Sequence, residues 1–285
     1  MRPDARIAAA ALLPVFLIAC ASQPVSTVAV PATPAPIAAA IDFHGVQAER
    51  FLATARIVTV REVGQGVTRP RRVTLERDGV THDAAFKWID ETRQGITAFA
   101  DGSLDTDFWD SWQTEVAAYR IDRLIGLGMV PATVERAVRG QAGSLMWWAD
   151  SAMSEQQRVE RAIRAPDLDA WDRQTLKIWL FDELIANVDR HMNNLLITED
   201  FEVRLIDHSR AFRVSRELKA PARLTRFSGA LLEGLEALTF DRLKQEVGRY
   251  LSDARIARLL DRRDAILELA RNLIATRGAA AVVYD

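Results

Sequence analysis

Cysteine is almost absent from this chain, which has one such residue, Cys20, among its 285 residues. A single thiol cannot form an intramolecular disulfide, and it cannot supply the several thiolates of a cysteine-based zinc site. The chain also has little excess charge of either sign, with 37 Lys and Arg against 39 Asp and Glu. Such a balance provides no broad basic surface, so we expect no nucleic-acid partner.

Apolar residues, by contrast, are plentiful. They make up 49% of the chain, and charged residues make up 27%. These proportions are typical of a globular protein rather than of a disordered or fibrous one. We expect a buried core whose stability comes from packing.

Residues 1–20 have the features of a targeting segment. Two arginines, Arg2 and Arg6, precede an apolar run over residues 7–18 that is short for a membrane span, which predicts a signal peptide. The run ends in Leu-Ile-Ala-Cys, which resembles the lipobox of bacterial lipoproteins. That resemblance implies a lipidated Cys20 that anchors the mature chain to a membrane. The alternative is a plain signal peptide or N-terminal anchor with an incidental cysteine, and both readings place the protein outside the cytoplasm.

Residues 21–42 are rich in proline and alanine, with four prolines between residues 24 and 36. Proline fixes φ and lacks an amide donor, so this composition predicts an extended tether. Ala21, rather than Asp, follows the expected lipidated cysteine, which resembles lipoproteins sorted to the outer membrane of diderm bacteria. We therefore expect a lipid-anchored protein of the cell envelope that faces the periplasm.

Three strand-like runs follow the tether. They cover residues 57–60, 73–76 and 84–89, and glycine, proline and aspartate separate them. This pattern predicts three short antiparallel strands. A helix is expected from about residue 110 to 127, because Ala117, Ile121 and Leu124 recur at helical spacing.

The rest of the chain is mostly helical in pattern. Residues 171–186 and 253–275 each place their apolar side chains on one side of a helix. The sequence thus predicts an α+β protein with a small lobe of antiparallel strands and one helix over residues 43–140. A larger, mainly helical lobe follows over residues 141–285, with a hinge near 140–148 and a ligand site between the lobes.

The most informative stretch lies between residues 187 and 212. Two apolar runs, 195–197 and 203–206, flank a short polar segment and predict a hairpin. Antiparallel pairing would bring Asn194 next to Asp207, with Asp189 a few residues upstream. Magnesium prefers oxygen ligands and takes one or two carboxylates plus phosphate oxygens, whereas a further carboxylate can accept or orient a hydroxyl. The stretch therefore indicates phosphoryl transfer.

The pattern Asn-x-Asp-Arg-His-x-x-Asn followed by Ile-Asp-His resembles the atypical kinases. These are the phosphatidylinositol 3- and 4-kinases, the HipA-like kinases and the secretory-pathway kinases of the Golgi casein kinase type. The resemblance implies a protein-kinase-like fold that binds ATP with Mg²⁺ or Mn²⁺. It also implies that Asp189 is the catalytic aspartate and that Asn194 and Asp207 are the metal ligands.

The small lobe contains further residues that this resemblance would assign to the nucleotide. Lys87 ends a strand and Glu115 lies early in the next helix, the order of a lysine-glutamate pair that holds phosphates. Gly64 and Gly66 lie between the first two strands, where backbone amides could cover phosphates.

Some residues of the region allow two readings. His191 and His208 could bind a metal, but we favour a structural role because the kinase pattern assigns the metal to oxygen ligands. The adjacent Trp147 and Trp148 could stack on an adenine, but a buried aromatic pair is favoured. Ser209 stands where the resembled families often have glycine.

We expect a metal- and ATP-dependent phosphotransferase that acts on an unknown acceptor in the cell envelope, either a protein, a lipid or a small molecule. One alternative is a non-catalytic, pseudokinase-like binding lipoprotein. A second is a metal-dependent hydrolase that uses His191, His208, Asp189 and Asp207.

Overall fold

The computed structural model describes residues 41–63, 70–93, 95–98, 104–105 and 108–285. Cys20, the expected signal peptide, the tether up to residue 40, Gly64 and Gly66 lie outside these ranges. None of the helices within them has an apolar stretch of the length that a bilayer crossing demands.

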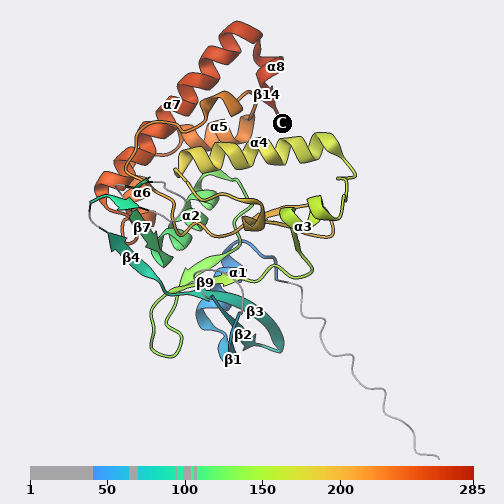
Figure 1. Cartoon of the computed structure of the whole chain (residues 1–285), viewed down its shortest axis with the longest axis vertical. Coiled ribbons are helices and arrows are strands. Elements are labelled where there is room, and N and C mark those ends of the chain that lie inside the picture. The colour runs from blue at the N-terminus through green and yellow to red at the C-terminus, as the bar shows by residue number, and fades with distance from the viewer. Residues whose placement is uncertain (1–40, 64–69, 94, 99–103, 106–107) are drawn as a thin grey trace, which may run out of the picture. The chain divides into compact units, whose positions relative to one another are not determined.

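The first part of the fold is an antiparallel sheet of five strands in the order β1-β2-β3-β9-β8 (Figure 1). Its strands are β1 (Arg56–Glu62), β2 (Arg71–Arg77), β3 (Val80–Lys87), β8 (Thr133–Glu135) and β9 (Ser144–Trp147). The three strands that the sequence predicts are confirmed as β1, β2 and β3. The sheet continues to Trp147, beyond residue 140, because β9 pairs with both β3 and β8.

Local chemistry explains the turn between β2 and β3. Asp78 and Gly79 join β2 to β3, and their φ angles are +52° and +79°. Positive φ at both central residues suits a two-residue hairpin turn, and an aspartate-glycine pair adopts it readily. The turn sets the register in which Val73 and Leu75 of β2 point into the core.

Two helices accompany the sheet. The predicted helix is confirmed as α2 (Trp112–Ile125), which begins where the Ser111 hydroxyl accepts a hydrogen bond from the Gln113 amide and ends at Gly126, φ +72°. The other helix, α1 (Val46–Thr54), buries Phe51, whose ring lies edge-on to Trp147 with centroids 5.5 Å apart.

Between β3 and α2 the chain forms two small pairs of antiparallel strands that the sequence does not indicate, one nested between the strands of the other in chain order. In the described residues these are β4 (Asp90–Arg93) paired with β7 (Phe108–Ser111), and β5 (Thr97–Ala98) paired with β6 (Leu104–Asp105). They place β7 directly before α2, and the Ser111 amide donates to the Ser209 carbonyl at 2.9 Å.

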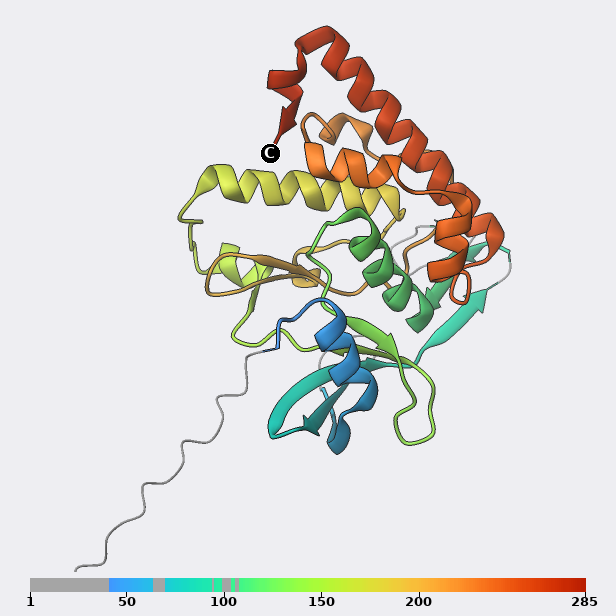
Figure 2. The ribbon, with the colours of Figure 1, turned by 180° about the vertical axis from the view of Figure 1, so that it is seen from behind.

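The second part of the fold is mainly helical (Figure 2). Its helices are α3 (Glu155–Glu160), α4 (Leu168–Leu184), α5 (Gly229–Glu236), α6 (Phe240–Val247), α7 (Asp253–Arg277) and α8 (Ala279–Val282). The remaining elements are β10 (Met153–Ser154), the 3₁₀ helix η1 (Met192–Asn194), β11 (Leu195–Ile197), β12 (Val203–Leu205), the 3₁₀ helix η2 (Pro221–Arg223), β13 (Phe227–Ser228) and β14 (Val283–Tyr284).

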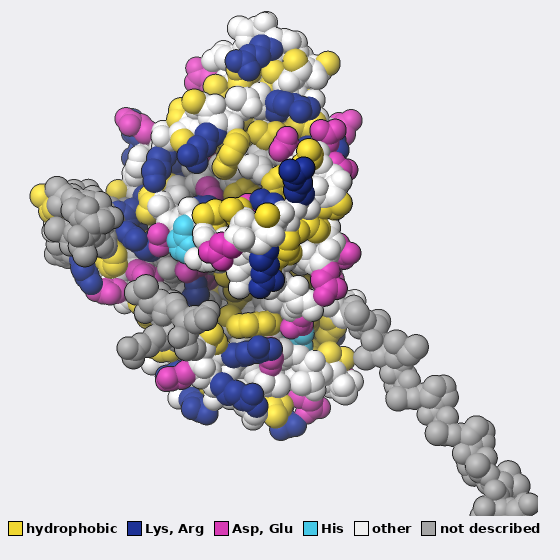
Figure 3. Space-filling model, turned by 45° about the vertical axis from the view of Figure 1, so that its right-hand side comes forward, with side chains coloured by type: hydrophobic (Ala, Val, Ile, Leu, Met, Phe, Trp, Pro, Cys, Tyr) yellow, Lys and Arg dark blue, Asp and Glu magenta, His cyan; other side chains and the backbone are white. Residues whose placement is uncertain are grey.

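The helical core forms where α7 packs against α4, α5 and α6, as Figures 1 and 2 show from opposite sides. Phe181 and Leu184 of α4 and Ile266 of α7 are fully buried there. The predicted α+β architecture, a small antiparallel sheet followed by a larger helical part, is thus confirmed. On the face shown in Figure 3, basic and acidic side chains are intermingled, as the nearly neutral composition leads one to expect.

Candidate functional site

Lys87 lies between two carboxylates at the end of β3. Its Nζ atom is 2.6 Å from Glu115 Oε1 and 2.7 Å from Asp207 Oδ1. The Lys87 side chain is 12% exposed and that of Glu115 is 2% exposed, whereas Asp207 keeps 30% of its side-chain surface. The structure therefore brings together three residues that are far apart in the sequence, and Asp207 is the most open of them.

The charges of this cluster stabilise one another. Burial alone disfavours the ammonium of Lys87, but the carboxylates of Glu115 and Asp207 outweigh it and hold the pKa of Lys87 above its usual value. Burial likewise disfavours the carboxylate of Glu115, but Lys87 and a hydrogen bond from His208 lower the pKa of Glu115 below its ordinary range. Both groups are charged at neutral pH.

This coupling predicts how stability depends on pH. Because the pKa of Glu115 is lowered on folding, its contribution is present above its ordinary value near 4.5 and is lost as the pH falls below it. We expect the stability advantage of the wild type over Glu115→Gln to shrink progressively as the pH falls below about 4.5, by up to about 1.4 kcal/mol per pH unit. Urea unfolding at each pH measures the difference. A pH-independent difference would contradict the charge pairing.

His208 supports Glu115 from the interior. Its backbone amide donates to Glu115 Oε2 at 3.0 Å, and its ring is fully buried at an edge-on contact with Phe181. Burial lowers the pKa of His208, so the ring is neutral. Such a buried ring serves packing, and His191 lies apart from it on the surface at the start of η1. Among the described residues, no group of three or more His, Cys, Asp or Glu side chains is arranged to hold a metal ion.

The hairpin predicted from residues 195–206 is confirmed as β11 and β12. Leu195 pairs with Leu205, and the Ile206 amide donates to the Asn194 carbonyl at 3.2 Å. Asn194 directly precedes β11 and Asp207 lies two residues after β12, so both lie at the open end of the hairpin. The Asn194 side-chain amide donates to the Asp189 carbonyl at 3.1 Å. The structure thus gathers the three polar residues at one end of the hairpin.

Asp189 presents its carboxylate to the surroundings, with 44% of its side chain exposed. Its backbone amide donates to Asn187 Oδ1 at 3.2 Å, which fixes the turn after α4. The Arg210 guanidinium lies 3.7 Å from Asp189 Oδ2. An exposed carboxylate held on a fixed turn is suited to accept a proton from a bound hydroxyl.

Arg190 connects α4 to the open end of the β11–β12 hairpin. The sequence marks this residue only as part of the Asp-Arg-His triplet of the motif. Its guanidinium binds both carboxylate oxygens of Asp182 in α4, with Nε 3.0 Å from Oδ2 and Nη2 3.0 Å from Oδ1. Its Nη1 atom also donates to the carbonyls of Asn194 at 3.0 Å and Ile206 at 2.7 Å. Asn194 directly precedes β11 and Ile206 directly follows β12, so both carbonyls lie at the open end of the hairpin. Arg190 therefore positions Asn194 and Asp207 relative to α4.

Ser209 fits its position without strain. The left-handed conformation falls on Asp207, φ +59°, and on Phe212, φ +62°, but Ser209 is not among the residues with positive φ. Its hydroxyl is 3.3 Å from Asp207 Oδ1. A serine is therefore compatible here, although the resembled families often have glycine.

Asp110 of β7 is a further carboxylate near the cluster that the sequence does not single out. Burial raises the pKa of Asp110, and the nearby charge of Asp207 adds to that rise, whereas a hydrogen bond with Ser209 opposes it. Its Oδ1 atom is buried and has no hydrogen-bond partner among the described residues. Asp110 thus lies close enough to Asp207 for the two carboxyl groups to interact electrostatically.

The donor set suits a hard divalent cation. Asp207 contributes a partly exposed carboxylate, and Asn194 uses its side-chain nitrogen toward Asp189, which leaves its amide oxygen as the other ligand. Mg²⁺ and Mn²⁺ accept such oxygen ligands, and two protein ligands leave positions for phosphate oxygens. Asn194 and Asp207 therefore fit an ion that binds together with a nucleotide.

The two adjacent tryptophans, Trp147 and Trp148, lie in different surroundings. Trp147 is buried and stacks on His82 with ring centroids 3.8 Å apart. Trp148 is half-buried under the Arg72 guanidinium, 4.4 Å from its ring centroid. Trp147 is thus part of the core, and the two rings do not form a single stacked pair.

Similarity to known proteins is found among solved structures and supports this fold. No family model and no curated protein matches the chain. Hydra Fam20 with sugar is similar, with a TM-score of 0.62 and 13% identity over 82% of this chain and 90% of that one. The Golgi casein kinase has a TM-score of 0.57 and 15% identity, over 83% of this chain and 78% of that one.

The Golgi casein kinase with Mn/ADP bound is also similar, with a TM-score of 0.55 and 14% identity over the same shares of the two chains. Identities this low establish a fold and not an activity. The likeness to phosphatidylinositol kinases and HipA-like kinases stays an expectation from the motif. The chain has an atypical kinase-like fold, similar to those of Fam20 and the Golgi casein kinase.

Proposed function

We propose that this protein is a metal-dependent phosphotransferase that uses ATP with Mg²⁺ or Mn²⁺. The observation that carries the proposal is the position of Lys87 between Glu115 and Asp207, beside the hairpin end that holds Asn194 and Asp189. This cluster combines a phosphate-binding cation, a metal-binding pair and an exposed carboxylate, which are the parts that phosphoryl transfer uses.

Each residue has a distinct role in the proposed reaction. Lys87 binds phosphate oxygens, and Glu115 keeps it charged and in place. Asn194 and Asp207 hold the divalent ion, which when bound neutralises the negative charge that develops on the phosphates. Asp189 accepts the proton of the acceptor hydroxyl while the oxygen of that hydroxyl forms a bond to the γ-phosphorus. The bond from that phosphorus to the bridging oxygen breaks, and ADP leaves with the electron pair.

Two further parts of the proposal rest on the sequence. The lipobox-like segment around Cys20 supports a lipid anchor in the cell envelope, with the acceptor there. The balanced charge supports an acceptor that is a protein, a lipid or a small molecule rather than a nucleic acid. A similar fold binds Mn/ADP in the Golgi casein kinase, which supports nucleotide and metal as the partners.

Thermal unfolding of the full chain tests the nucleotide site. We expect ATP with Mn²⁺ or Mg²⁺ to raise the unfolding midpoint, because a ligand at 100 times its dissociation constant adds about 2.7 kcal/mol of stability. Asp207→Ala removes a proposed metal ligand and should abolish the metal-dependent shift. Asp200→Ala is the matched control, since Asp200 is exposed in the turn between β11 and β12.

A shift that Asp200→Ala retains and Asp207→Ala loses supports the proposed site. Equal shifts in both variants would place the metal elsewhere. No shift with any nucleotide or metal would favour the alternative of a non-catalytic binding lipoprotein.

A further inference from the structure

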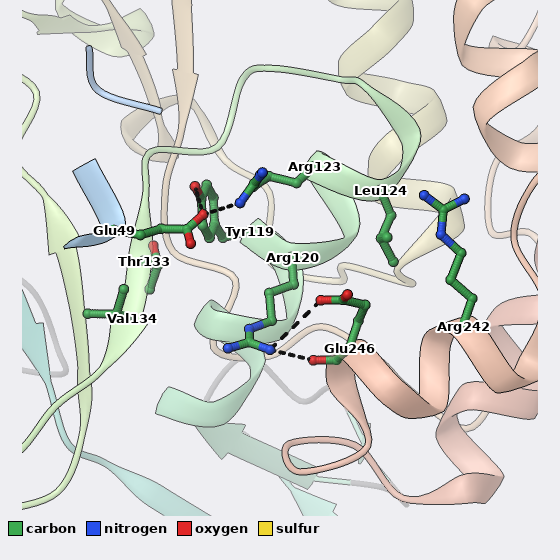
Figure 4. Close-up of a pocket in the computed structure, with 9 residues that line it drawn as sticks. All are labelled: Glu49, Tyr119, Arg120, Arg123, Leu124, Thr133, Val134, Arg242 and Glu246. Atoms are coloured by element: carbon green, nitrogen blue, oxygen red, sulfur yellow. Dashed lines mark hydrogen bonds and ion pairs between the residues drawn. The ribbon is translucent and has the colours of Figure 1, made fainter. Parts of the chain in front are cut away.

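A second site lies on α2, the helix that also holds Glu115. A cavity of about 300 Å³ opens between α1, α2, β8 and α6 (Figure 4). Among the described residues that line it are Arg120 and Arg123 of α2 and Arg242 of α6, which extend from two different helices. The kinase-like chemistry proposed above uses none of these residues.

The acidic residues of the cavity are already paired. Glu49 of α1 accepts a hydrogen bond from the Tyr119 hydroxyl at 2.7 Å, and Arg123 also donates to it. The Glu246 carboxylate of α6 lies 4.0 Å from Arg120 Nη1. Figure 4 shows both pairs as dashed lines across the cavity. The two carboxylates are thus matched by two guanidinium groups, and a third positive charge remains.

Arg242 is that third charge. It is exposed, and the one described hydrogen bond of its side chain is a long contact from Nη1 to the Ala237 carbonyl at 3.4 Å. No ion pair to Arg242 is found among the residues that the structure describes. In Figure 4 its side chain rises from α6 beside Leu124.

Arg120 is held in place by α6 and by Tyr250. Its Nη1 atom donates to the Glu246 carbonyl at 2.7 Å, and its guanidinium carbon lies 5.2 Å from the centroid of the Tyr250 ring. A guanidinium fixed in this way keeps further N–H donors and loses little freedom when it binds an anion.

We propose that this cavity binds a small phosphate-type oxyanion, either free phosphate or the phosphate group of a small ester. Guanidinium groups bind such oxyanions through paired, charge-assisted hydrogen bonds, and the cavity has one guanidinium in excess of its carboxylates. The volume of about 300 Å³ is at the lower end of the range for small-molecule sites, which suits a small ligand. An anion held by Arg120 or Arg123 on one side and Arg242 on the other connects α2 to α6. The site stands independently of the proposed phosphotransferase.

Thermal unfolding of the full chain in metal-free buffer with EDTA tests the site, with Asp207→Ala as the background so that phosphate does not act through the nucleotide site. The probes are inorganic phosphate and glycerol 3-phosphate, each compared with chloride at equal ionic strength. Arg242→Gln should weaken the apparent affinity for the bound probe about tenfold, because it removes one charge-assisted interaction. Arg271→Gln, an exposed arginine of α7, is the matched control.

Among the described residues the Arg242 side chain has only the long contact to the Ala237 carbonyl, so Arg242→Gln should unfold at nearly the same temperature as its parent when no anion is present. A stronger response to phosphate identifies a free anion, whereas a stronger response to the ester identifies a phosphomonoester, and either supports the site. An equal response in Arg242→Gln and Arg271→Gln, or no response beyond that of chloride, would overturn the proposal.

Discussion

Replacing Asp189 with asparagine should lower the rate of phosphoryl transfer by about 10²- to 10⁴-fold, which is the usual contribution of a positioned general base. Asparagine has nearly the same shape, but its amide cannot take the proton of the acceptor hydroxyl. Lys87, Asn194 and Asp207 keep their contacts, because Asp189 uses only its backbone toward Asn194 and Asn187. Nucleotide affinity should therefore change little.

Release of ADP in the presence of Mn²⁺ measures this effect without knowledge of the acceptor, since water can take its place. Asp200→Asn, in the exposed turn of the same hairpin, provides the matched control and should keep the wild-type rate. Unchanged turnover in Asp189→Asn would remove Asp189 from the catalytic role. Loss of nucleotide binding together with turnover would show that Asp189 acts on the fold of the site instead.

The parts of the fold that sequence could predict are those fixed by local pattern. In strands β1 to β3, apolar residues either alternate with polar ones or form short continuous runs, and turn residues flank each strand. The Asp78-Gly79 pair defines the hairpin between β2 and β3. The helix α2 has a capping serine before it and a glycine after it, so both of its ends lie within two residues of the expected ones. The residues that form each of these strand, turn and cap signals lie close together in the chain, so one sequence is enough to recognise them.

Strand β9 was missed because its signal is not local. All four of its residues are buried between β3 and β8, so it lacks the alternation that marks a half-exposed strand. At Gly143, immediately before it, a Cβ atom would lie 2.2 Å from the Lys87 carbonyl, so the close approach to β3 needs glycine. The hinge that the sequence predicts near residues 140–148 contains this strand of the sheet.

The candidate site likewise has parts that local sequence predicts and parts that depend on contacts between distant residues. The hairpin could be predicted, and with it the proximity of Asn194 and Asp207, because both follow from the spacing of two apolar runs. The contact of Asp207 with Lys87 spans 120 residues, so the sequence supports it only through a family resemblance. Asp110, from the hairpins between β3 and α2, had no motif to mark it. Its position near Asp207 depends on how β7 packs.

Arg190 is the missed residue whose loss should have the largest effect on the fold of the site. Its side chain is 11% exposed and that of Asp182 is 13% exposed, so the pair is largely buried. Arg190→Met would leave the Asp182 carboxylate with only Asn187 as a described partner and would remove a donor from the carbonyls of Asn194 and Ile206. Breaking a buried pair in this way costs about 3 to 5 kcal/mol, which urea unfolding would measure.

Arg164→Met, at an exposed position before α4, should have little effect and is the matched control. Arg190→Lys keeps the charge but places it at one point, so it cannot reach Asp182 and both carbonyls together and should recover only part of the stability. A double-mutant cycle with Asp182→Asn then isolates the pair, because residues in direct contact couple by roughly 0.5 to 3 kcal/mol. If Arg190→Met matches Arg164→Met in stability, the hairpin end must be held by its own strand pairing. Asn194 and Asp207 would then keep their places without any connection to α4.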